Sequence, residues 1–527
     1  MAVNTSHASG RRPASLYIWV PALVVSAAVL LSPVYLVIRA AEEGADIWPR
    51  LSDASVVAAA ARTVLLTVTV TGACIAAGVP LAWLTARTDL PLRRMFTVLL
   101  ALPLSIPSFI GGFVMISALG PGGMVQDLLE PFGVERVPSM YGFWGSWLTL
   151  TAFSYPYVYL TTRAALQRAD PALEEAARSL GKTSRETFFS VNMPQLRPGI
   201  AAGAILVALY VLSEFGAVSM LRYDTLTPLA YIQYTSSFDR SAAAVIGLPL
   251  LVFAILLVAL EPLTRGRAQY ASHRPRPART LRLGRWRWPA AVTCALVVLV
   301  GLGLPIMVIL YWLVRGLAEG ESTRFLASAV ANSVRASTVA AIVAVIAAMP
   351  VALLSLRPSP GTTVIEKLAY LGQSLPGITV ALSLVYFTAN YASPVYQTFG
   401  LLVFAYAVRF LPEALGSTRA ALLQVHPHTQ EAASSLGAAR PRVFARITLP
   451  QILPGISAGA VLVFITVMKE LQITLLLSPI GFDTLATQVW ATSREAFFTQ
   501  AALPAMLLVG VSGAAVLLIL RRESHLS

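Results

Sequence analysis

The sequence predicts an all-α, polytopic integral membrane protein with about twelve transmembrane helices in two parallel six-helix repeats. Three observations predict this class. Of 527 residues, 56% are hydrophobic and only 12% are charged, with a mean hydropathy of +0.71, whereas about a quarter of the residues of a soluble domain are charged. Apolar runs of about 20 residues, long enough to cross the hydrocarbon core, recur along the chain. A set of motifs also recurs at a separation of 256 residues.

The first six spans are expected in the first half of the chain. The polar residues 1–15 precede an apolar run that ends near Ile38. No cleavage site follows this run, so we expect a retained first span and not a removed signal peptide. Five further runs lie at about 57–85, 95–119, 142–163, 199–219 and 242–263.

The second half repeats this pattern after a basic interruption. Its six runs lie at about 289–314, 331–356, 368–389, 397–418, 456–478 and 500–520. The sequence therefore predicts one six-span repeat over 1–263, a basic cytoplasmic linker over 264–288, and a second six-span repeat over 289–527.

The basic residues indicate how the chain is oriented in the membrane. The formal net charge is +14, and residues 264–287 hold eight arginines without an acidic residue. Arginine tracts between apolar runs follow the positive-inside rule, so we expect both termini in the cytoplasm and a bacterial inner-membrane location. A phosphate-binding face is not indicated, and no nucleic-acid partner is expected. The linker is expected to contact anionic lipid head groups.

Cysteine and histidine do not indicate a metal or disulfide site. Cys74 and Cys294 each lie inside an apolar run, and the five histidines lie in polar tails or loops. We therefore expect neither a disulfide framework nor a thiolate or imidazole metal site within the membrane.

The internal repeat predicts the relation between the two halves. Matching positions 256 residues apart include Pro156 and Pro412, Pro198-Gly199-Ile200 and Pro454-Gly455-Ile456, and Glu214 and Glu470. An even number of spans in each repeat gives both the same orientation. We expect a pseudo-twofold axis along the membrane normal, with a pathway between the halves.

A cytoplasmic helix–turn–helix is predicted between the fourth and fifth spans of the first half. Asp170 can cap a helix that begins at Pro171. Gly181 is placed to end this helix in a left-handed conformation. Thr183 to Glu186 then forms a capping-box pattern for a second short helix, which is expected to stop before Pro194. The second half repeats this design.

These segments, near 170–198 and 426–454, resemble the EAA loop of permease subunits in binding-protein-dependent ABC importers. The matching residues are Glu175, Ala176, Ala177, Gly181 and Pro194 in the first copy, and Glu431, Ala432, Ala433, Gly437 and Pro450 in the second. Met193 stands where the family has leucine. The resemblance implies that each loop is a coupling helix that docks in a groove of an ATP-hydrolysing subunit.

The chain itself is not expected to bind ATP. Gly181-Lys182-Thr183 is similar to the end of a phosphate-binding loop, but Ala176 occupies the position where that pattern requires another glycine. We therefore expect no enzymatic activity in this chain and no cofactor bound to it. The resemblance implies that ATP and magnesium are bound by two copies of a separate ATPase subunit.

Two acidic residues at matching positions are candidates for the translocation pathway. Glu214 and Glu470 fall within the predicted fifth spans, where a carboxylate is costly unless it faces a cavity or a partner. They could form an acidic pair whose oxygen atoms suit ferric ion transiently. The alternative is that they make gate-closing hydrogen bonds or ion pairs, with Lys469 neutralising part of the charge. Asp224 and Asp483, near the outer ends, are expected to order the outer loops.

The paired EAA loops and the layout of two repeats in one chain resemble fused ferric-iron permeases of ABC importers. The resemblance implies ferric iron as the substrate and an external ferric-binding protein as a partner. Related permeases for thiamine, and more distant ones for polyamines or phosphonates, are alternatives. An alternative from another class is a secondary transporter driven by an ion gradient, against which the duplicated loop argues. An enzyme acting on lipid lacks any paired catalytic constellation in the sequence.

Overall fold

A computed structural model describes residues 16–121, 123–133, 139–236, 240–264, 280–321, 326–356 and 359–526. Across these ranges the regular elements are helical, apart from one isolated β-bridge between Thr88 and Leu281. The all-α prediction is confirmed. Much of the predicted basic linker, residues 265–279, lies outside the described residues.

The chain divides into two compact units that do not coincide with its two sequence halves. Unit 1 comprises Met1–Val34, Ala336–Gln373 and Val403–Val467, and unit 2 comprises Tyr35–Arg335, Ser374–Leu402 and Met468–Ser527. Unit 2 is therefore built from both halves of the sequence.

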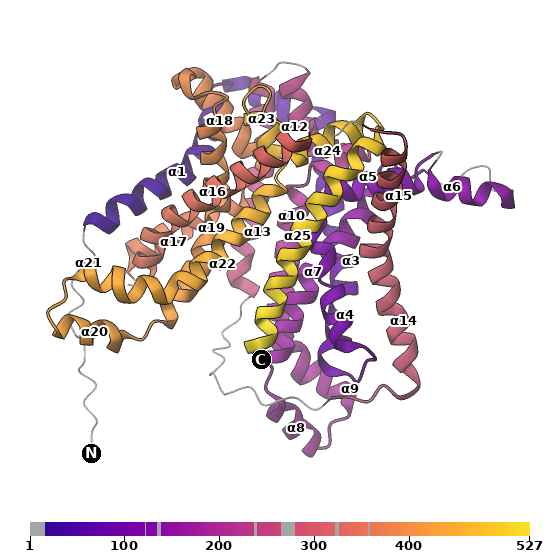
Figure 1. The fold of residues 1–527 in the computed structure, drawn as a ribbon, viewed down its shortest axis with the longest axis horizontal. Helices are drawn as coiled ribbons and strands as arrows, with labels where there is room; N and C mark the ends of the chain where they lie inside the picture. Colours follow the sequence, from indigo (N-terminus) through magenta and orange to yellow (C-terminus); the bar gives the residue numbers. More distant parts are fainter. Residues whose placement is uncertain are drawn as a thin grey trace. The chain divides into compact units, whose positions relative to one another are not determined.

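The α-helices of the first half are shown in Figure 1. They are α1 (Leu16–Ala41), α2 (Ile47–Leu51), α3 (Ala54–Arg87), α4 (Arg93–Leu99), α5 (Ser108–Leu119), α6 (Met124–Leu129), α7 (Phe143–Arg168), α8 (Pro171–Ser179), α9 (Ser184–Thr187), α10 (Met193–Leu212), α11 (Gly216–Met220), α12 (Leu226–Thr235) and α13 (Arg240–Thr264).

The second half continues with twelve further α-helices among the described residues. They are α14 (Arg287–Val298), α15 (Leu304–Ala318), α16 (Leu326–Ser355), α17 (Pro360–Ser374), α18 (Gly377–Tyr391), α19 (Phe399–Gln424), α20 (Pro427–Ser435), α21 (Arg440–Val443), α22 (Leu449–Met468), α23 (Gln472–Leu477), α24 (Leu485–Arg494) and α25 (Phe498–Leu526).

Most of the predicted spans appear as long apolar helices. In the described part of the chain, ten helical ranges are long and apolar enough to cross a membrane, and a pair bent by 99°, Pro360–Gly372 with Gly377–Tyr391, brings the number to eleven. The predicted run 142–163 corresponds to α7, which is 26 residues long but more polar. Its Ser146, Thr149 and Ser154 are buried. A helix enclosed by other helices does not need a lipophilic surface.

Four predicted spans are broken, and their continuity as single helices is a wrong expectation. The run 368–389 is the bent pair α17 and α18, and three further runs are interrupted. The run 95–119 divides into α4, a 3₁₀ turn over Leu102–Ser105, and α5. The runs 199–219 and 456–478 end as helices at Leu212 and Met468, before the short helices α11 and α23 begin. Pro103 and Pro107 in the break of the run 95–119 lack the N–H group that a helix requires. The breaks after Leu212 and Met468 contain the predicted acidic pair.

The helix after the first EAA turn was expected to stop before Pro194. It continues through Pro194 instead, and this expectation is wrong. A π-helical turn over Phe188–Asn192 joins α9 to α10, so Pro194 is the second residue of α10. The second half has the same π turn at Phe444–Thr448, before α22. A proline inside an α-helix clashes with the carbonyl four residues earlier, and widening the preceding turn relieves that clash.

Small residues allow the spans around each EAA loop to pack closely. In unit 2, α3, α7 and α10 lie side by side (Figure 1). A Cβ atom at Gly199 of α10 would lie 2.6 Å from the Cβ of Ala165 in α7. The corresponding position in unit 1 is Gly455, where a Cβ would lie 2.4 Å from the Cβ of Ala421. Each half therefore packs its fourth span against its fifth through the same glycine–alanine contact.

Candidate functional site

The first EAA loop forms a short helix with both ends satisfied by local hydrogen bonds. The Asp170 side chain accepts a hydrogen bond from the Ala172 amide at 2.9 Å, as the predicted N-cap. At the other end, the Lys182 amide donates to the Ala177 carbonyl at 3.2 Å and the Gly181 amide to the Arg178 carbonyl at 3.0 Å. This pattern is a Schellman motif, which requires a left-handed residue at Gly181. Its φ of 84° confirms that expectation.

The second EAA loop, in unit 1, ends in the same way. Gly437 has a φ of 84°. The Ala438 amide donates to the Ala433 carbonyl at 3.1 Å, which reproduces the first-copy bond 256 residues further along the chain. The sequence repeat is therefore also a repeat of backbone conformation.

The two EAA motifs expose the same residues. Glu175 and Ala176 are exposed while Ala177 is only 6% exposed. In the second copy Glu431 and Ala432 are exposed while Ala433 is 9% exposed. The second alanine of each motif thus packs against the chain. The glutamate and the first alanine remain free to contact another molecule.

Each loop also exposes a leucine just before its glycine. Leu180 is 83% exposed and Leu436 is 89% exposed, again at positions 256 residues apart. An exposed leucine alone needs no explanation. Here the same leucine follows the same exposed motif in both copies, so each loop offers an apolar tip beside a polar face.

The predicted capping box follows the first glycine. The Thr183 amide donates to Glu186 Oε2 at 2.9 Å, and the Glu186 amide donates to Thr183 Oγ1 at 3.3 Å. The two reciprocal bonds satisfy two amides at the start of α9. The capping-box prediction is confirmed.

Glu214 lies in the break between α10 and α11, not inside a spanning helix. Its side chain is buried, and both carboxylate oxygens accept a hydrogen bond from Ser108 Oγ at 2.8 Å. Its Oε1 also accepts from the Ala217 amide at 2.9 Å, at the start of α11. The carboxylate therefore caps a short helix and joins it to the start of α5.

Glu470 occupies the matching break between α22 and α23 and repeats the cap. Its Oε1 accepts a hydrogen bond from the Ile473 amide at 3.2 Å. Lys469 Nζ donates to the Leu104 carbonyl at 3.4 Å. The expectation that the two acids lie inside spanning helices is wrong, but their symmetric placement in the chain is matched by symmetric hydrogen bonding.

Gln472 joins the two breaks to each other within unit 2. Its Nε2 donates to the Ser213 carbonyl at 2.6 Å, next to Glu214 in the chain. Its Oε1 accepts from the Ile378 amide at 2.9 Å, at the start of α18. The residue just before Glu214 and the residue two positions after Glu470 are therefore in direct contact.

Asp224 and Asp483 lie in the turns that follow α11 and α23. Asp224 Oδ2 lies 3.4 Å from Arg62 Nη1 on α3, and both side chains are well exposed. The carbonyl of Asp483 accepts a hydrogen bond from Asn332 Nδ2 of α16 at 3.0 Å. Both contacts tie a loop to a neighbouring helix.

Comparison with known proteins places these repeated features in a family. The model of binding-protein-dependent transport system inner membrane components matches residues 78–270 and 340–522. The chain belongs to this family. Each matched range contains one EAA loop, so the predicted resemblance to ABC importer permeases is confirmed.

Curated relatives of this permease include both fused and shorter chains. The Fe(3+)-transport system permease protein FbpB 2 of Haemophilus influenzae is 35% identical, over 94% of this chain and 96% of its own length. A probable molybdenum ABC transporter permease of Haloferax volcanii is 31% identical, over 41% of this chain and 80% of its own. The sulfate transport system permease protein CysT of Escherichia coli is 28% identical, over 41% of this chain and 78% of its own length.

Sequence reasoning missed two residues that organise the acidic breaks of the permease. Ser108 holds Glu214, and Gln472 links the breaks. Gln472 was detectable as a polar residue within the apolar run 456–478. Ser108 gave no such signal, since serine is common at helix starts.

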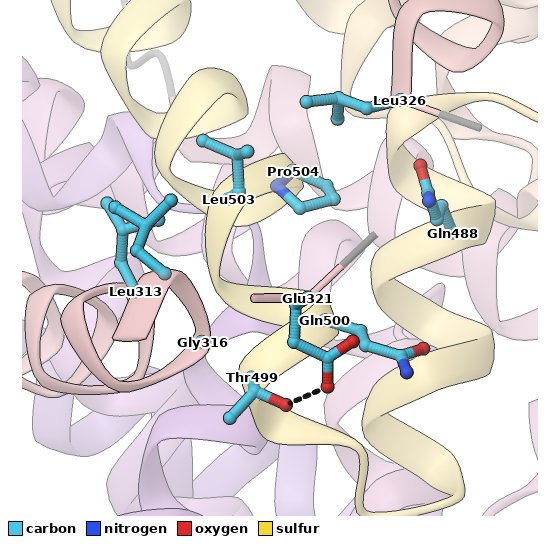
Figure 2. Close-up of a pocket in the computed structure, with 10 residues that line it drawn as sticks. Leu313, Gly316, Glu321, Leu326, Gln488, Thr499, Gln500, Leu503 and Pro504 are labelled. Carbon is cyan, nitrogen blue, oxygen red and sulfur yellow. Dashed lines mark hydrogen bonds between the residues drawn. The ribbon is translucent and has the colours of Figure 1, made fainter. Parts of the chain in front are cut away.

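A pocket with a volume of about 90 Å³ opens in unit 2 between α15, α24 and α25 (Figure 2). Thr499 Oγ1 donates to Glu321 Oε1 at 3.0 Å on one side of it. Leucines and Pro504 make up much of the rest: Leu313, Leu317, Leu326 and Leu503. None of the predicted site residues lines this pocket. Within the described residues, no group of three or more His, Cys, Asp or Glu side chains is arranged to hold a metal ion.

Proposed function

We propose that this chain is the membrane permease of an ATP-driven importer that takes up ferric iron delivered by an external binding protein. The observation that carries the substrate assignment is the 35% identity to the Fe(3+)-transport permease over 94% of this chain. The sulfate and molybdenum relatives match less than half of the chain. The layout of two repeats in one chain thus favours iron.

The matching conformation of α8 and α20 supports coupling to two ATPase subunits. Each helix is nine residues long, is followed by a left-handed glycine, and is exposed on the face that carries the glutamate and first alanine of the motif. Two equivalent faces suit two copies of one partner. In this proposal ATP and magnesium are bound by those partners, and this chain hydrolyses nothing.

The proposal also includes the predicted domains and membrane orientation. Residues 1–263 and 289–527 form the two permease repeats, with the basic segment 264–288 between them. Both termini and both EAA loops face the cytoplasm of a bacterial cell, across its inner membrane. The outer turns that contain Asp224 and Asp483 face the compartment from which the binding protein delivers iron.

The mechanism that follows is alternating access. When the ATPases close on ATP, they move the two EAA loops together, and the helices joined to those loops open the pathway toward the docked binding protein. Hydrolysis then resets the pathway inward. Glu214 and Glu470 would meet the ferric ion transiently as substrate, through carboxylate oxygens, which suit a hard cation.

Transport of a defined solute in reconstituted vesicles tests this function. The permease is purified with its ATPase subunits, and uptake is measured with binding protein loaded with ferric iron or with thiamine. We expect ATP-dependent uptake of iron and none of thiamine. Thiamine uptake would assign the solute differently, and uptake driven by an ion gradient without ATPase would place the chain in another class of transporter.

The exposed face of each EAA loop gives a second test. Ala176→Trp and Ala432→Trp should block binding of the ATPase because they place bulk on the docking face, while insertion persists. Ile480→Trp is the control, because Ile480 is 92% exposed but lies in an outer turn. If the alanine variants bind the ATPase as well as the control does, the loops do not dock as proposed.

A further inference from the structure

The cytoplasmic end of α3 touches the first EAA loop at two points. Arg87 Nη2 donates to Glu174 Oε2 at 2.9 Å, and the two side chains are 5% and 14% exposed. One turn earlier on α3, the Trp83 ring packs edge-on against Phe188 of the π turn, with centroids 5.0 Å apart. Residues four apart share a helix face. One face of α3 thus holds both the coupling helix and the turn that follows it.

Glu174 has a second partner that differs in kind. Arg178 Nη2 donates to Glu174 Oε1 at 2.6 Å, but Arg178 is 39% exposed and lies on α8 itself. An ion pair within one helix whose arginine is exposed contributes little and connects the helix to nothing else. Removing one partner of a buried pair instead leaves an unpaired buried charge. Of the two arginines, only Arg87 ties α8 to a spanning helix.

Leu281 and Leu283, in the last part of the linker, bind the same end of α3. The Leu281 amide donates to the Arg87 carbonyl at 2.8 Å, and the Asp89 amide donates to the Leu281 carbonyl at 3.1 Å. The Leu283 amide then donates to Asp89 Oδ1 at 2.8 Å. The backbone of the residue that holds the first coupling helix is therefore also bonded to the last part of the linker, a few residues before the second repeat.

The second EAA loop cannot form this ion pair. Gln430 occupies the position 256 residues after Glu174, so the carboxylate is replaced by an amide.

We propose that Arg87 is a positioning residue that transmits displacement of α8 to α3 and thereby to the core of unit 2. This inference rests on the proposed role of α8 as the contact for an ATPase. The helix is nine residues long, too short to be stable alone. Its movement therefore reaches the membrane through its contacts. Arg87 supplies a buried, charge-assisted contact to a helix that packs against both α7 and α10.

The test measures iron transported per ATP hydrolysed in vesicles that contain the whole transporter. Arg87→Gln and Glu174→Gln should each lower this ratio at least fivefold. The matched control, Arg315→Gln, removes an arginine that pairs with a glutamate four residues along, outside the EAA loops, and should stay within twofold of the unmodified protein. The double variant R87Q/E174Q leaves no buried charge unpaired. Its membrane yield and ATPase binding should therefore match those of the unmodified protein, while the amount of iron transported per ATP stays low.

A merely structural pair would give another result. Transmission through Arg87 is overturned if the double variant transports as much iron per ATP as the unmodified protein. It is also overturned if Arg87→Gln alone leaves this ratio unchanged. An unmodified transporter without ATP-dependent uptake would instead overturn the proposed function, and the two failures are distinguishable because the first requires an active parent protein.

Discussion

Gly181 and Gly437 hold the turns that end the two coupling helices. Both have a φ of 84°, and a Cβ atom at either position would meet no atom within 4 Å. Space is therefore no obstacle to a side chain. The left-handed backbone is the obstacle, because an L-residue pays roughly 1–2 kcal/mol there and a β-branched one more.

Replacing these glycines with valine should uncouple the permease without unfolding it. We expect Gly181→Val with Gly437→Val to lower ATP-dependent uptake at least tenfold, while the protein still inserts in the membrane. Uptake and membrane yield are the measurements. Asparagine tolerates the left-handed region and is the control at both positions. Uptake at the unmodified rate in the valine variant would show that the turns do not position the loops.

At the scale of elements, the π turns ahead of Pro194 and Pro450 set the rotation between each EAA loop and its fifth span. A π turn accommodates one more residue than an α turn, so its loss would rotate the preceding segment by about 100°. The described residues contain a third case, Leu299–Gly303 ahead of Pro305. All three π turns stand directly before a residue that precedes proline.

Pro194→Ala and Pro450→Ala should therefore shift the loops. Alanine restores the missing donor and removes the clash, which favours an ordinary α turn. We expect uptake to fall severalfold, and a cysteine introduced at the exposed Phe189 to change its labelling rate in the first variant. Pro198→Ala is the matched control, because Pro198 lies in α10 without a π turn before it. Unchanged uptake and labelling would contradict this account.

The sequence predicted those elements whose chemistry is local. Asp170 and Gly181 act within a few residues of themselves, so the coupling helix and its ends were readable. The breaks at Leu212 and Met468 were not, because hydropathy averaged over a window does not register a carboxylate that turns back to cap the next helix. The prediction that the helix stops before Pro194 was wrong for a related reason. Proline usually ends a helix, but here the preceding π turn lets the helix continue through it.

For the whole molecule, the acidic pair stands where segments of both halves meet in unit 2. Gln replaces Glu without a change of shape and keeps an oxygen that can accept from the Ala217 or Ile473 amide. We predict that Glu214→Gln with Glu470→Gln lowers iron uptake at least tenfold while assembly with the ATPases persists. Receptor-stimulated ATP hydrolysis should survive in part, because the EAA loops are unchanged.

Uptake and ATP turnover in the same vesicles check this prediction. Ser108→Ala is the control that removes a hydrogen bond of Glu214 but keeps its charge. Unchanged uptake in the double variant would remove the pair from the pathway. Loss of assembly or of all ATPase activity would assign the pair to gating or packing.

The composition of unit 2 predicts that the two halves associate without a covalent link. It contains residues from 35 to the end of the first half, and from the second half the residues up to 335 together with 374–402 and 468–527. Chains 1–264 and 280–527, expressed together, should co-purify and transport iron within about threefold of the fused protein. Each expressed alone should do neither. A failure of the pair to co-purify would show that the linker is required for assembly.

The bridge between α3 and the returning linker also has a consequence for the timing of synthesis. Asp89 and Leu283 are 194 positions apart in the chain. At about 5–20 residues per second, roughly 10–40 s separate their emergence from the ribosome. During that interval the first half enters the membrane, yet the end of α3 lacks its hydrogen-bond partners at residues 281 and 283. We expect the nascent first half to recruit ATPase poorly until residue 283 has emerged, so that incomplete chains do not waste ATP.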